Sequence, residues 1–133
     1  MRKFDDLAGK IAIVTGGARG IGLATAVIAD LLTEQAEESC KELLADGLEA
    51  FATAVNVKDP QSIEKMVQTV IDRFGRIDIL VNNAGIVDNT PMLDLTVEGW
   101  DNVIDINLRG MQLCTQACLK RMIGQGSGKI VFM

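Results

Sequence analysis

A glycine-rich turn follows closely after a run of apolar, β-prone residues near the start of the chain. Residues 11–14 (IAIV) run into Thr15, and in the sequence GGARGIG that follows, Gly16, Gly20 and Gly22 stand where a strand must give way to a helix. An unbroken apolar run is typical of a buried parallel strand. Glycines let the backbone turn tightly and approach a phosphate because they carry no Cβ, and a helix that opens near Gly20 adds unpaired N–H groups and a positive dipole end. The stretch therefore predicts an anion-binding turn, with a tight loop that holds no ligand as the alternative.

A second polar turn ends another apolar run. Residues 77–81 (IDILV) lead into Asn82, Asn83, Ala84 and Gly85. Ligands of parallel α/β sheets bind outside the carboxyl ends of the strands, and both turns fall at such ends. This coincidence favours a ligand site over a plain loop.

The chain is short of side chains for proton transfer and for metal binding. It contains no His and no Tyr, which often move protons in enzymes that work near neutral pH. Cys40, Cys114 and Cys118 are an odd number and widely spread, which argues against a disulfide framework. Cys114 and Cys118 would share a helix face, but no His completes a metal site, so we expect buried free thiols and no metal.

Composition and charge indicate one soluble globular domain over residues 1–133. The chain is 48% hydrophobic and 23% charged, with a net charge of −5, which suits a single core. The acidic balance argues against nucleic acid and acidic membranes as partners, and no apolar run approaches the ~20 residues that span a bilayer. No apolar core of a signal peptide follows the first residues, so we expect a cytoplasmic protein.

Strand-like and helical patterns alternate along the chain. Apolar runs predict strands at residues 11–15, 49–57, 77–81 and 129–133. Apolar residues at three- and four-residue steps predict helices at residues 21–46, 60–74 and 96–122. Asp59 and Pro60 start the second of these helices, and Gly75 ends it. The alternation predicts a Rossmann-like, doubly wound α/β fold with a parallel sheet and right-handed crossovers.

These motifs together resemble the classical short-chain dehydrogenase/reductase family. The resemblance rests on TGGARGIG at residues 15–22, NNAG at residues 82–85, and Asn107 followed by Gly110 in the long helix, and it extends over residues 8–133. It implies an NAD(P) cofactor that lies across the sheet. The phosphates would lie along the glycine turn, beside Gly16, Arg19, Gly20, Ile21 and Gly22. The ribose and nicotinamide would be flanked by Asn83, Ala84 and Gly85.

The resemblance also bears on the choice between NAD and NADP. Asp30 resembles the acid at the end of the family's second strand, which binds the ribose 2′-OH and repels a 2′-phosphate. Arg19, in contrast, is often seen where NADP is used; we favour NAD. Asn56 and Val57 stand where the family usually has Asp-Val beside the adenine, and an amide can still donate and accept toward the ring. A polar strand end is the alternative for Asn56.

The first crossover is too short for the family pattern. Eleven residues separate Thr15 from Val27, whereas a parallel crossover with its helix needs about a dozen or more. Either a segment of about ten residues is missing and Asp30 ends a second strand, or residues 21–46 form one continuous helix in which Asp30 is a solvated charge. We favour the missing segment, which predicts the N-terminal part of the fold with a shortened first crossover.

Of the active site that the resemblance implies, this chain carries one residue. A Ser would orient the substrate carbonyl, a Tyr would protonate it, and a Lys would lower the pKa of the Tyr, all beyond Met133. Asn107 would support the water chain that resupplies the proton. The resemblance implies hydride transfer between nicotinamide and a small alcohol or ketone, such as a 3-oxoacyl compound. We therefore predict an incomplete oxidoreductase that is inactive as a 133-residue chain.

Two other functions stay open. A non-catalytic nucleotide-binding or self-associating fragment would lack the same Tyr and Lys. A methyltransferase-like domain would need an acid after its second strand but not the NNAG turn. The long helix carries a broad apolar surface and residues 130–132 would form an open strand edge, so we expect a homo-oligomer.

Overall fold

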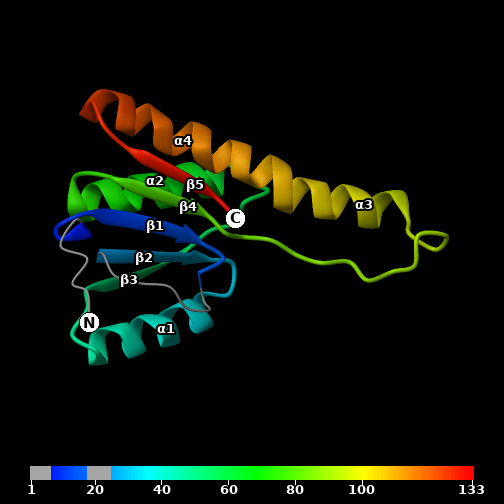
Figure 1. Ribbon diagram of the computed structural model, residues 1–133, viewed down its shortest axis with the longest axis horizontal. Coiled ribbons are helices and arrows are strands. Elements are labelled where there is room, and N and C mark those ends of the chain that lie inside the picture. The colour runs from blue at the N-terminus through cyan, green and yellow to red at the C-terminus, as the bar shows by residue number, and fades with distance from the viewer. Residues whose placement is uncertain (1–6, 18–24) are drawn as a thin grey trace.

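The fold is a parallel sheet with helices packed on its faces (Figure 1). The computed structural model describes residues 7–17 and 25–133. Within them, the strand order is β3-β2-β1-β4-β5, which matches the first five places of the doubly wound order. The strands are β1 (Ile11–Thr15), β2 (Thr25–Asp30), β3 (Ala50–Ala54), β4 (Ile79–Asn82) and β5 (Lys129–Phe132). The helices are α1 (Thr33–Ala45), α2 (Pro60–Phe74), α3 (Val97–Ile104), the π-helical turn η2 (Asp105–Arg109) and α4 (Gly110–Gln125).

Strand β1 lies at the centre of the sheet and is buried along its whole length. It pairs in parallel with β2 and β4, so that Ile13 lies beside Val27 and Leu80. All three side chains have an exposed fraction of 0%. A strand that is covered on both faces needs apolar residues at successive positions, which explains the unbroken apolar run.

The second strand is present, and the continuous helix over residues 21–46 is wrong. Strand β2 ends at Asp30, and α1 begins three residues later at Thr33. Between them the Asp30 carboxylate accepts a hydrogen bond from the backbone N–H of Leu32 (3.0 Å), and such a bond favours a turn over a continuing helix. The spacing was ambiguous because a short apolar run fits a buried strand as well as a buried stretch of helix.

The connection between β1 and β2 is short. Nine residues, 16–24, join the two strands, fewer than the dozen or so of an ordinary parallel crossover. An extended chain of nine residues reaches about 30 Å, enough to return along a strand of about 17 Å, and the strands pair in parallel from Ile11 beside Thr25 to Thr15 beside Ala29. The predicted fold class is therefore confirmed as a Rossmann-like α/β sheet with a shortened first crossover.

The helices divide the interior into a large and a small core. Helices α2 and α4 lie together on one side of the sheet, and α1 lies on the other side, against β2 and β3 (Figure 1). In the larger core, Met66 of α2 and Cys114 of α4 pack with Leu80 of β4. In the smaller core, Cys40 of α1 packs against Ile28 of β2. The loops at the carboxyl edge of the sheet are thus mounted on a rigid, mostly apolar frame.

The cysteines belong to these cores. Cys40, Cys114 and Cys118 are buried and form no disulfide with one another. Burial is the main cause that raises the pKa of Cys114 and of Cys118 to about 12, so both thiols are protonated at neutral pH and unreactive. Across residues 7–17 and 25–133, no three His, Cys, Asp or Glu side chains gather as a metal site requires.

Helix α2 begins and ends where the sequence predicts. The Asp59 carboxylate accepts a hydrogen bond from the N–H of Gln61 (2.9 Å), and Pro60 stands in the first turn. Gly75 ends the helix with φ = 75°, a left-handed conformation that glycine adopts without strain. None of the helices in the described part of the chain has the length and apolar character to span a membrane.

Other predicted boundaries also differ from the structure, most clearly at the end of β3 and in the long helical segment. Strand β3 ends at Ala54 rather than at residue 57, because Asn56 accepts a hydrogen bond from the N–H of Lys58 (3.0 Å) and turns the chain. The predicted helix over residues 96–122 begins with Thr96 as its cap, whose hydroxyl accepts from the N–H of Gly99 (3.1 Å). That helix is divided by η2 and extends to Gln125.

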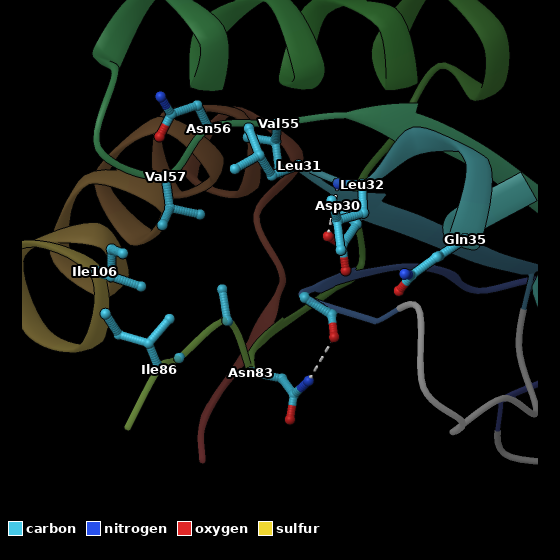
Figure 2. Close-up of a pocket in the computed structure, with 13 residues that line it drawn as sticks. Asp30, Leu31, Leu32, Gln35, Val55, Asn56, Val57, Asn83, Ile86 and Ile106 are labelled. Carbon is cyan, nitrogen blue, oxygen red and sulfur yellow. Dashed lines mark hydrogen bonds between the residues drawn. The ribbon is translucent and has the colours of Figure 1, made fainter. Parts of the chain in front are cut away.

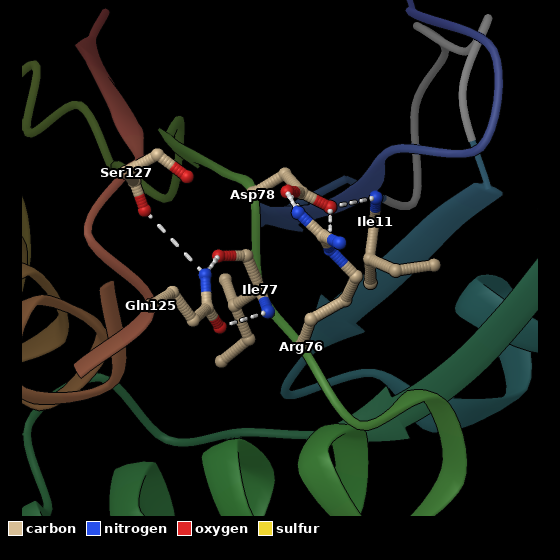
Figure 3. Close-up of polar contacts among 6 residues, drawn as sticks. All are labelled: Ile11, Arg76, Ile77, Asp78, Gln125 and Ser127. Atoms are coloured by element: carbon tan, nitrogen blue, oxygen red, sulfur yellow. Dashed lines mark hydrogen bonds and ion pairs between the residues drawn. The ribbon is translucent and has the colours of Figure 1, made fainter. Parts of the chain in front are cut away.

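Polar side chains fasten the strands together at the amino edge of the sheet (Figure 3). The Asp78 carboxylate accepts hydrogen bonds from the backbone N–H of Ile11 (2.9 Å) and from Nε of Arg76 (2.9 Å). The Gln125 side chain accepts from the N–H of Ile77 (3.0 Å) and donates to its carbonyl (2.8 Å). These contacts join β1, α4 and the residues that precede β4. They lie at the opposite edge of the sheet from the turns that follow β1 and β4.

Candidate functional site

A cleft of about 670 Å³ opens at the carboxyl edge of the sheet (Figure 2). Segments that follow four successive strands of the chain, together with α1 and η2, form its walls. The lining residues are Gly16 after β1, Asp30, Leu31 and Leu32 after β2, Gln35 of α1, Val55, Asn56 and Val57 after β3, Asn83, Ala84, Gly85 and Ile86 after β4, and Ile106 of η2. Such a position is where parallel α/β sheets bind ligands.

The turns after β1 and β4 lie in direct contact. Gly16 has φ = 62°, and a Cβ there would lie 2.7 Å from the Cα of Ala84, closer than two carbon atoms can approach without a backbone shift. The Asn83 side chain donates to the carbonyl of Gly16 (3.1 Å). Gly16 is therefore required by both its backbone angle and its neighbour, and the NNAG turn closes directly against the glycine turn.

Thr15 links the same two turns from below. Its side chain is buried, with 1% exposed, and its hydroxyl accepts hydrogen bonds from the N–H groups of Asn83 (3.1 Å) and Ala84 (3.2 Å). The hydroxyl also lies 3.4 Å from the carbonyl of Val81, to which it donates. This role of Thr15 was not predicted from the sequence; the available signal was a polar residue at the end of an otherwise apolar buried strand.

Asn107 fixes the next part of the loop. Its side-chain carbonyl accepts from the N–H of Ile86 (2.8 Å), and its amide donates to the carbonyl of Ile86 (2.8 Å). A Cβ on Gly85 would lie 3.4 Å from the same Asn107 oxygen. Asn107 belongs to η2, and π-helical turns inside α-helices often occur at functional sites. The structure thus places Asn107 beside Gly85 and Ile86, two residues that line the cleft.

Three further predicted residues line the cleft where it is formed by the end of β2 and the segment after β3: Asp30, Asn56 and Val57. Asp30 is partly buried and holds the N–H of Leu32, as described above. The N–H of Asn56 donates to the hydroxyl of Ser62 in α2 (2.9 Å), and the Asn56 side chain closes the turn at Lys58. Val57 is 8% exposed, and its side chain points into the cleft toward Ile106 (Figure 2).

The described lining of the cleft carries one ionisable side chain, Asp30. No Lys or Arg stands among those residues. The remaining polar groups of the walls are amides and backbone atoms, which can donate or accept without carrying charge. The wall near Asp30 therefore suits a hydroxyl donor better than a second negative charge.

The structure brings together most but not all of the predicted site residues. Gly16, Asp30, Asn56, Val57, Asn83, Ala84 and Gly85 line one cleft, and Asn107 braces its rim. Arg19, Gly20, Ile21 and Gly22 lie outside the described residues. Lining residues that the sequence did not indicate are Leu31, Leu32, Gln35, Val55 and Ile106; they are apolar or uncharged residues with no distinctive local pattern.

Comparison with protein families decides the classification. The family model described as short chain dehydrogenase matches residues 10–133, nearly the whole chain. The chain belongs to the short-chain dehydrogenase/reductase family. The solved structure of gox2181 agrees, with 35% sequence identity and a TM-score of 0.88 over 93% of this chain and 52% of that one.

Named relatives include 3-oxoacyl-[acyl-carrier-protein] reductases. The chain is 40% identical to a 3-oxoacyl-[acyl-carrier-protein] reductase of Synechocystis, over 94% of this chain and 55% of that protein. It is 37% identical to the 3-oxoacyl-[acyl-carrier-protein] reductase FabG of Staphylococcus aureus, over 92% of this chain and 54% of that protein. The chain therefore spans about half the length of the relatives that it matches.

The same alignments show that positions are missing within the matched region. The match to the Synechocystis reductase runs over 136 positions, yet 94% of a 133-residue chain is about 125 residues, so about 11 positions have no counterpart here. The match to the Staphylococcus aureus reductase runs over 133 positions, and 92% of this chain is about 122 residues. Again about 11 positions have no counterpart here. This number agrees with the segment of about ten residues that the short first crossover predicts.

Proposed function

We propose that this chain is the dinucleotide-binding part of an NAD(P)-dependent oxidoreductase, which transfers hydride between nicotinamide and an alcohol or ketone. The observation that supports this most strongly is the single cleft shared by Gly16, Asp30, Val57 and the NNAG turn. Membership of the short-chain dehydrogenase/reductase family rests on the match over residues 10–133.

The residues of the cleft fit a dinucleotide. Gly16 lines the cleft with backbone atoms alone, and a phosphate can approach such a backbone closely. Asp30 can accept a hydrogen bond from a ribose hydroxyl, and Val57 offers an apolar surface to a flat ring. Asn83, Ala84 and Gly85 would hold the nicotinamide end, where the bound cofactor supplies or accepts the hydride.

The residues of this chain then divide the task of positioning. Thr15 and Asn83 keep the NNAG turn against the glycine turn, and Asn107 holds the loop at Ile86. These contacts orient the reacting end of the site before any ligand arrives, which lowers the entropic part of a barrier. We propose that Asn107 serves the proton supply of the complete enzyme from this corner.

We propose NAD rather than NADP as the preferred cofactor. The Asp30 carboxylate would repel the additional phosphate of NADP. Isothermal titration of NAD⁺ and NADP⁺ into the chain tests both points: we expect NAD⁺ to bind more tightly. A folded chain that binds neither at millimolar concentration would contradict the proposal.

The substrate that we propose is a 3-oxoacyl thioester or a similar small carbonyl compound, since two of the named relatives are 3-oxoacyl-[acyl-carrier-protein] reductases. The 133-residue chain contains no Tyr, so it lacks the acid that the resemblance assigns to the carbonyl, a contribution of about 10²–10⁴-fold. We expect no NADH oxidation by this chain with a panel of 3-oxoacyl thioesters and ketones. Sustained turnover would show that another group supplies the proton.

A second candidate function is a non-catalytic fragment that associates with itself or with another chain. It is favoured by the apolar groove beside α4 and β5, which Leu108, Leu119 and Phe132 help to line. These three side chains are 63%, 40% and 60% exposed.

We also propose that the missing positions fall between β1 and β2, where the crossover is short. Their absence would weaken phosphate binding in this chain relative to its relatives.

A further inference from the structure

Helix α4 begins in unusually close contact with the segment that follows β3. Its first residue, Gly110, is buried, and a Cβ placed there would lie 2.9 Å from Cγ2 of Val57, 3.0 Å from its Cβ and 3.3 Å from its carbonyl oxygen. Real Cβ atoms essentially never approach another heavy atom within 3.0 Å. The helix can lie this close to Val57 because residue 110 has no side chain.

Val57 has little freedom to move away from such a contact. Its side chain is branched at Cβ, so its rotamers are restricted, and it is 8% exposed within the main core. One residue before it, the N–H of Asn56 is held by Ser62. One residue after it, the Lys58 ammonium donates to the Asn102 side chain of α3 (2.8 Å). Segment 56–58 is thus fixed from three helices, and Gly110 provides the buried contact.

The residues just before Gly110 also position other parts of the cleft lining, at Ile106 and Ile86. Ile106 precedes Gly110 by four residues in η2 and lines the cleft opposite Val57 (Figure 2). Asn107, three residues before Gly110, holds Ile86. A shift of α4 away from Val57 would therefore move both walls relative to each other.

We propose that Gly110 is a positioning residue, which sets the separation of α4 from Val57 and thereby the width of the cleft at the end that would receive the adenine ring. The ligand part of this inference rests on the proposed function; the steric part does not. A bulkier residue at position 110 would separate the helix from Val57 by several tenths of an ångström and loosen the fit to a flat ring.

The first part of the test needs no ligand. Gly110→Ala is compared with Gly124→Ala, a glycine of the same helix whose added Cβ meets nothing within 4 Å. We expect Gly110→Ala to lower the urea midpoint and to shift the Val57 methyl signals in ¹³C–¹H spectra. Gly124→Ala should raise the midpoint slightly, because alanine favours helix, and leave Val57 unchanged.

Rescue distinguishes positioning from general damage. Val57→Ala removes the closest atom that a Cβ at position 110 would meet, so the double variant should lose less stability than the two single losses predict. Val57→Ala combined with Gly124→Ala should be additive. Additive losses in the Gly110 cycle, or an unshifted Val57 signal in Gly110→Ala, would overturn the inference.

The second part uses NAD⁺ and ADP as probes. We expect Gly110→Ala to weaken both by about tenfold, equivalent to ~1.4 kcal/mol, with nicotinamide mononucleotide unaffected and Gly124→Ala unchanged for all three. Unchanged ADP affinity in Gly110→Ala would overturn the proposed effect on the cleft. If the unaltered chain binds neither NAD⁺ nor ADP, the proposed function fails, whereas the ligand-free cycle still decides the Gly110–Val57 contact.

Discussion

Thr15 shows how one hydroxyl can organise a site without touching a ligand. It is buried at the end of β1 and satisfies the N–H groups of Asn83 and Ala84 across 68 and 69 residues of sequence. A buried N–H that loses its acceptor costs more than an ordinary hydrogen bond contributes, because it has also lost its water. The Thr15 oxygen therefore contributes to the geometry of the NNAG turn, beside the hydrogen bond of the Asn83 side chain to Gly16.

The variant Thr15→Val keeps the shape of the side chain and removes that oxygen. We expect the free energy of unfolding to fall by about 1–3 kcal/mol, measured by urea denaturation. Thr69→Val is the matched control, since the Thr69 hydroxyl is exposed and bonds only its own helix at Lys65; its effect should stay within about 0.5 kcal/mol. Equal effects of the two substitutions would show that the Thr15 hydroxyl is not special.

Asp30 carries the proposed preference for NAD. The substitution Asp30→Asn removes the negative charge and keeps an oxygen that can accept from the N–H of Leu32. We expect the ratio of NAD⁺ to NADP⁺ affinity to fall by about tenfold, or ~1.4 kcal/mol, in titration calorimetry. Asp59→Asn, at the start of α2 and outside the cleft lining, should leave the ratio unchanged. An unchanged ratio in Asp30→Asn would contradict the assignment of Asp30 to the ribose.

Among the helices and strands, short-range sequence signals correctly predicted the features that depend only on neighbouring residues. The start of α2 at Pro60 and its end at Gly75 follow from a cap and a left-handed glycine, which act within one helical turn. The apolar run of β1 correctly predicted a buried central strand. The segment over residues 25–30 left strand and helix open, because burial on both faces removes the periodicity that distinguishes them.

The contacts that build the site were beyond a local reading. Asn107 meets Ile86 across 21 residues, and Thr15 meets Asn83 across 68; no periodic pattern encodes such pairs. Asn107 was indicated only through the family resemblance, whereas Gly16 and Asn83 were also indicated by their turns at the carboxyl ends of strands. The contact between Gly110 and Val57 likewise depends on how α4 packs, which requires the assembled fold.

The Asp78 carboxylate, which joins β1 to the residues before β4 at the amino edge of the sheet, should make the stability of the chain depend on pH. Burial alone would raise the pKa of Asp78, but hydrogen bonds from Arg76 and from the N–H of Ile11, together with the charge of Arg76, outweigh it and hold the pKa below its ordinary value. A carboxylate whose pKa is lower in the folded state contributes stability above the unfolded pKa, and that contribution disappears as pH falls through the folded pKa.

We therefore expect the chain to lose stability as pH falls below about 3.8, the ordinary value for Asp, and Asp78→Asn to reduce this dependence. At neutral pH, Asp78→Asn should cost ~1–2 kcal/mol, mainly through the weakened acceptor for Ile11, since the Arg76 end of the pair is half-exposed and screened. Asp101→Asn, an exposed residue of α3, serves as the control. Identical acid denaturation curves for the chain and Asp78→Asn would contradict the prediction.

At the scale of the whole molecule, the sheet and its helices leave an apolar surface uncovered. The groove beside α4 and β5 is about 380 Å³ and is lined largely by apolar side chains, and in the described part of the chain β5 pairs only with β4. Exposed apolar grooves and open strand edges favour association. The expected homo-oligomer is consistent with this surface and remains a proposal.

Sedimentation of two matched leucine variants tests the proposed association. Leu108 in η2 is 63% exposed and lines the groove, whereas Leu44 in α1 is 54% exposed and lies on the other side of the sheet. We expect the unaltered chain to sediment as a dimer or larger species, Leu108→Glu to shift it toward monomer, and Leu44→Glu to leave it unchanged. A monomeric unaltered chain, or an equal shift in both variants, would contradict association through the groove.

The central claim is that a dinucleotide lies in the cleft that Gly16, Asp30, Val57 and Asn83 help to line. The most direct test is a titration of the ¹⁵N-labelled chain with NAD⁺, followed through backbone amide signals. The account predicts that the largest shifts fall on Gly16, Val57, Asn83 and Ala84. Shifts that instead gather on the groove at Leu119, or an unchanged spectrum at millimolar NAD⁺, would contradict it.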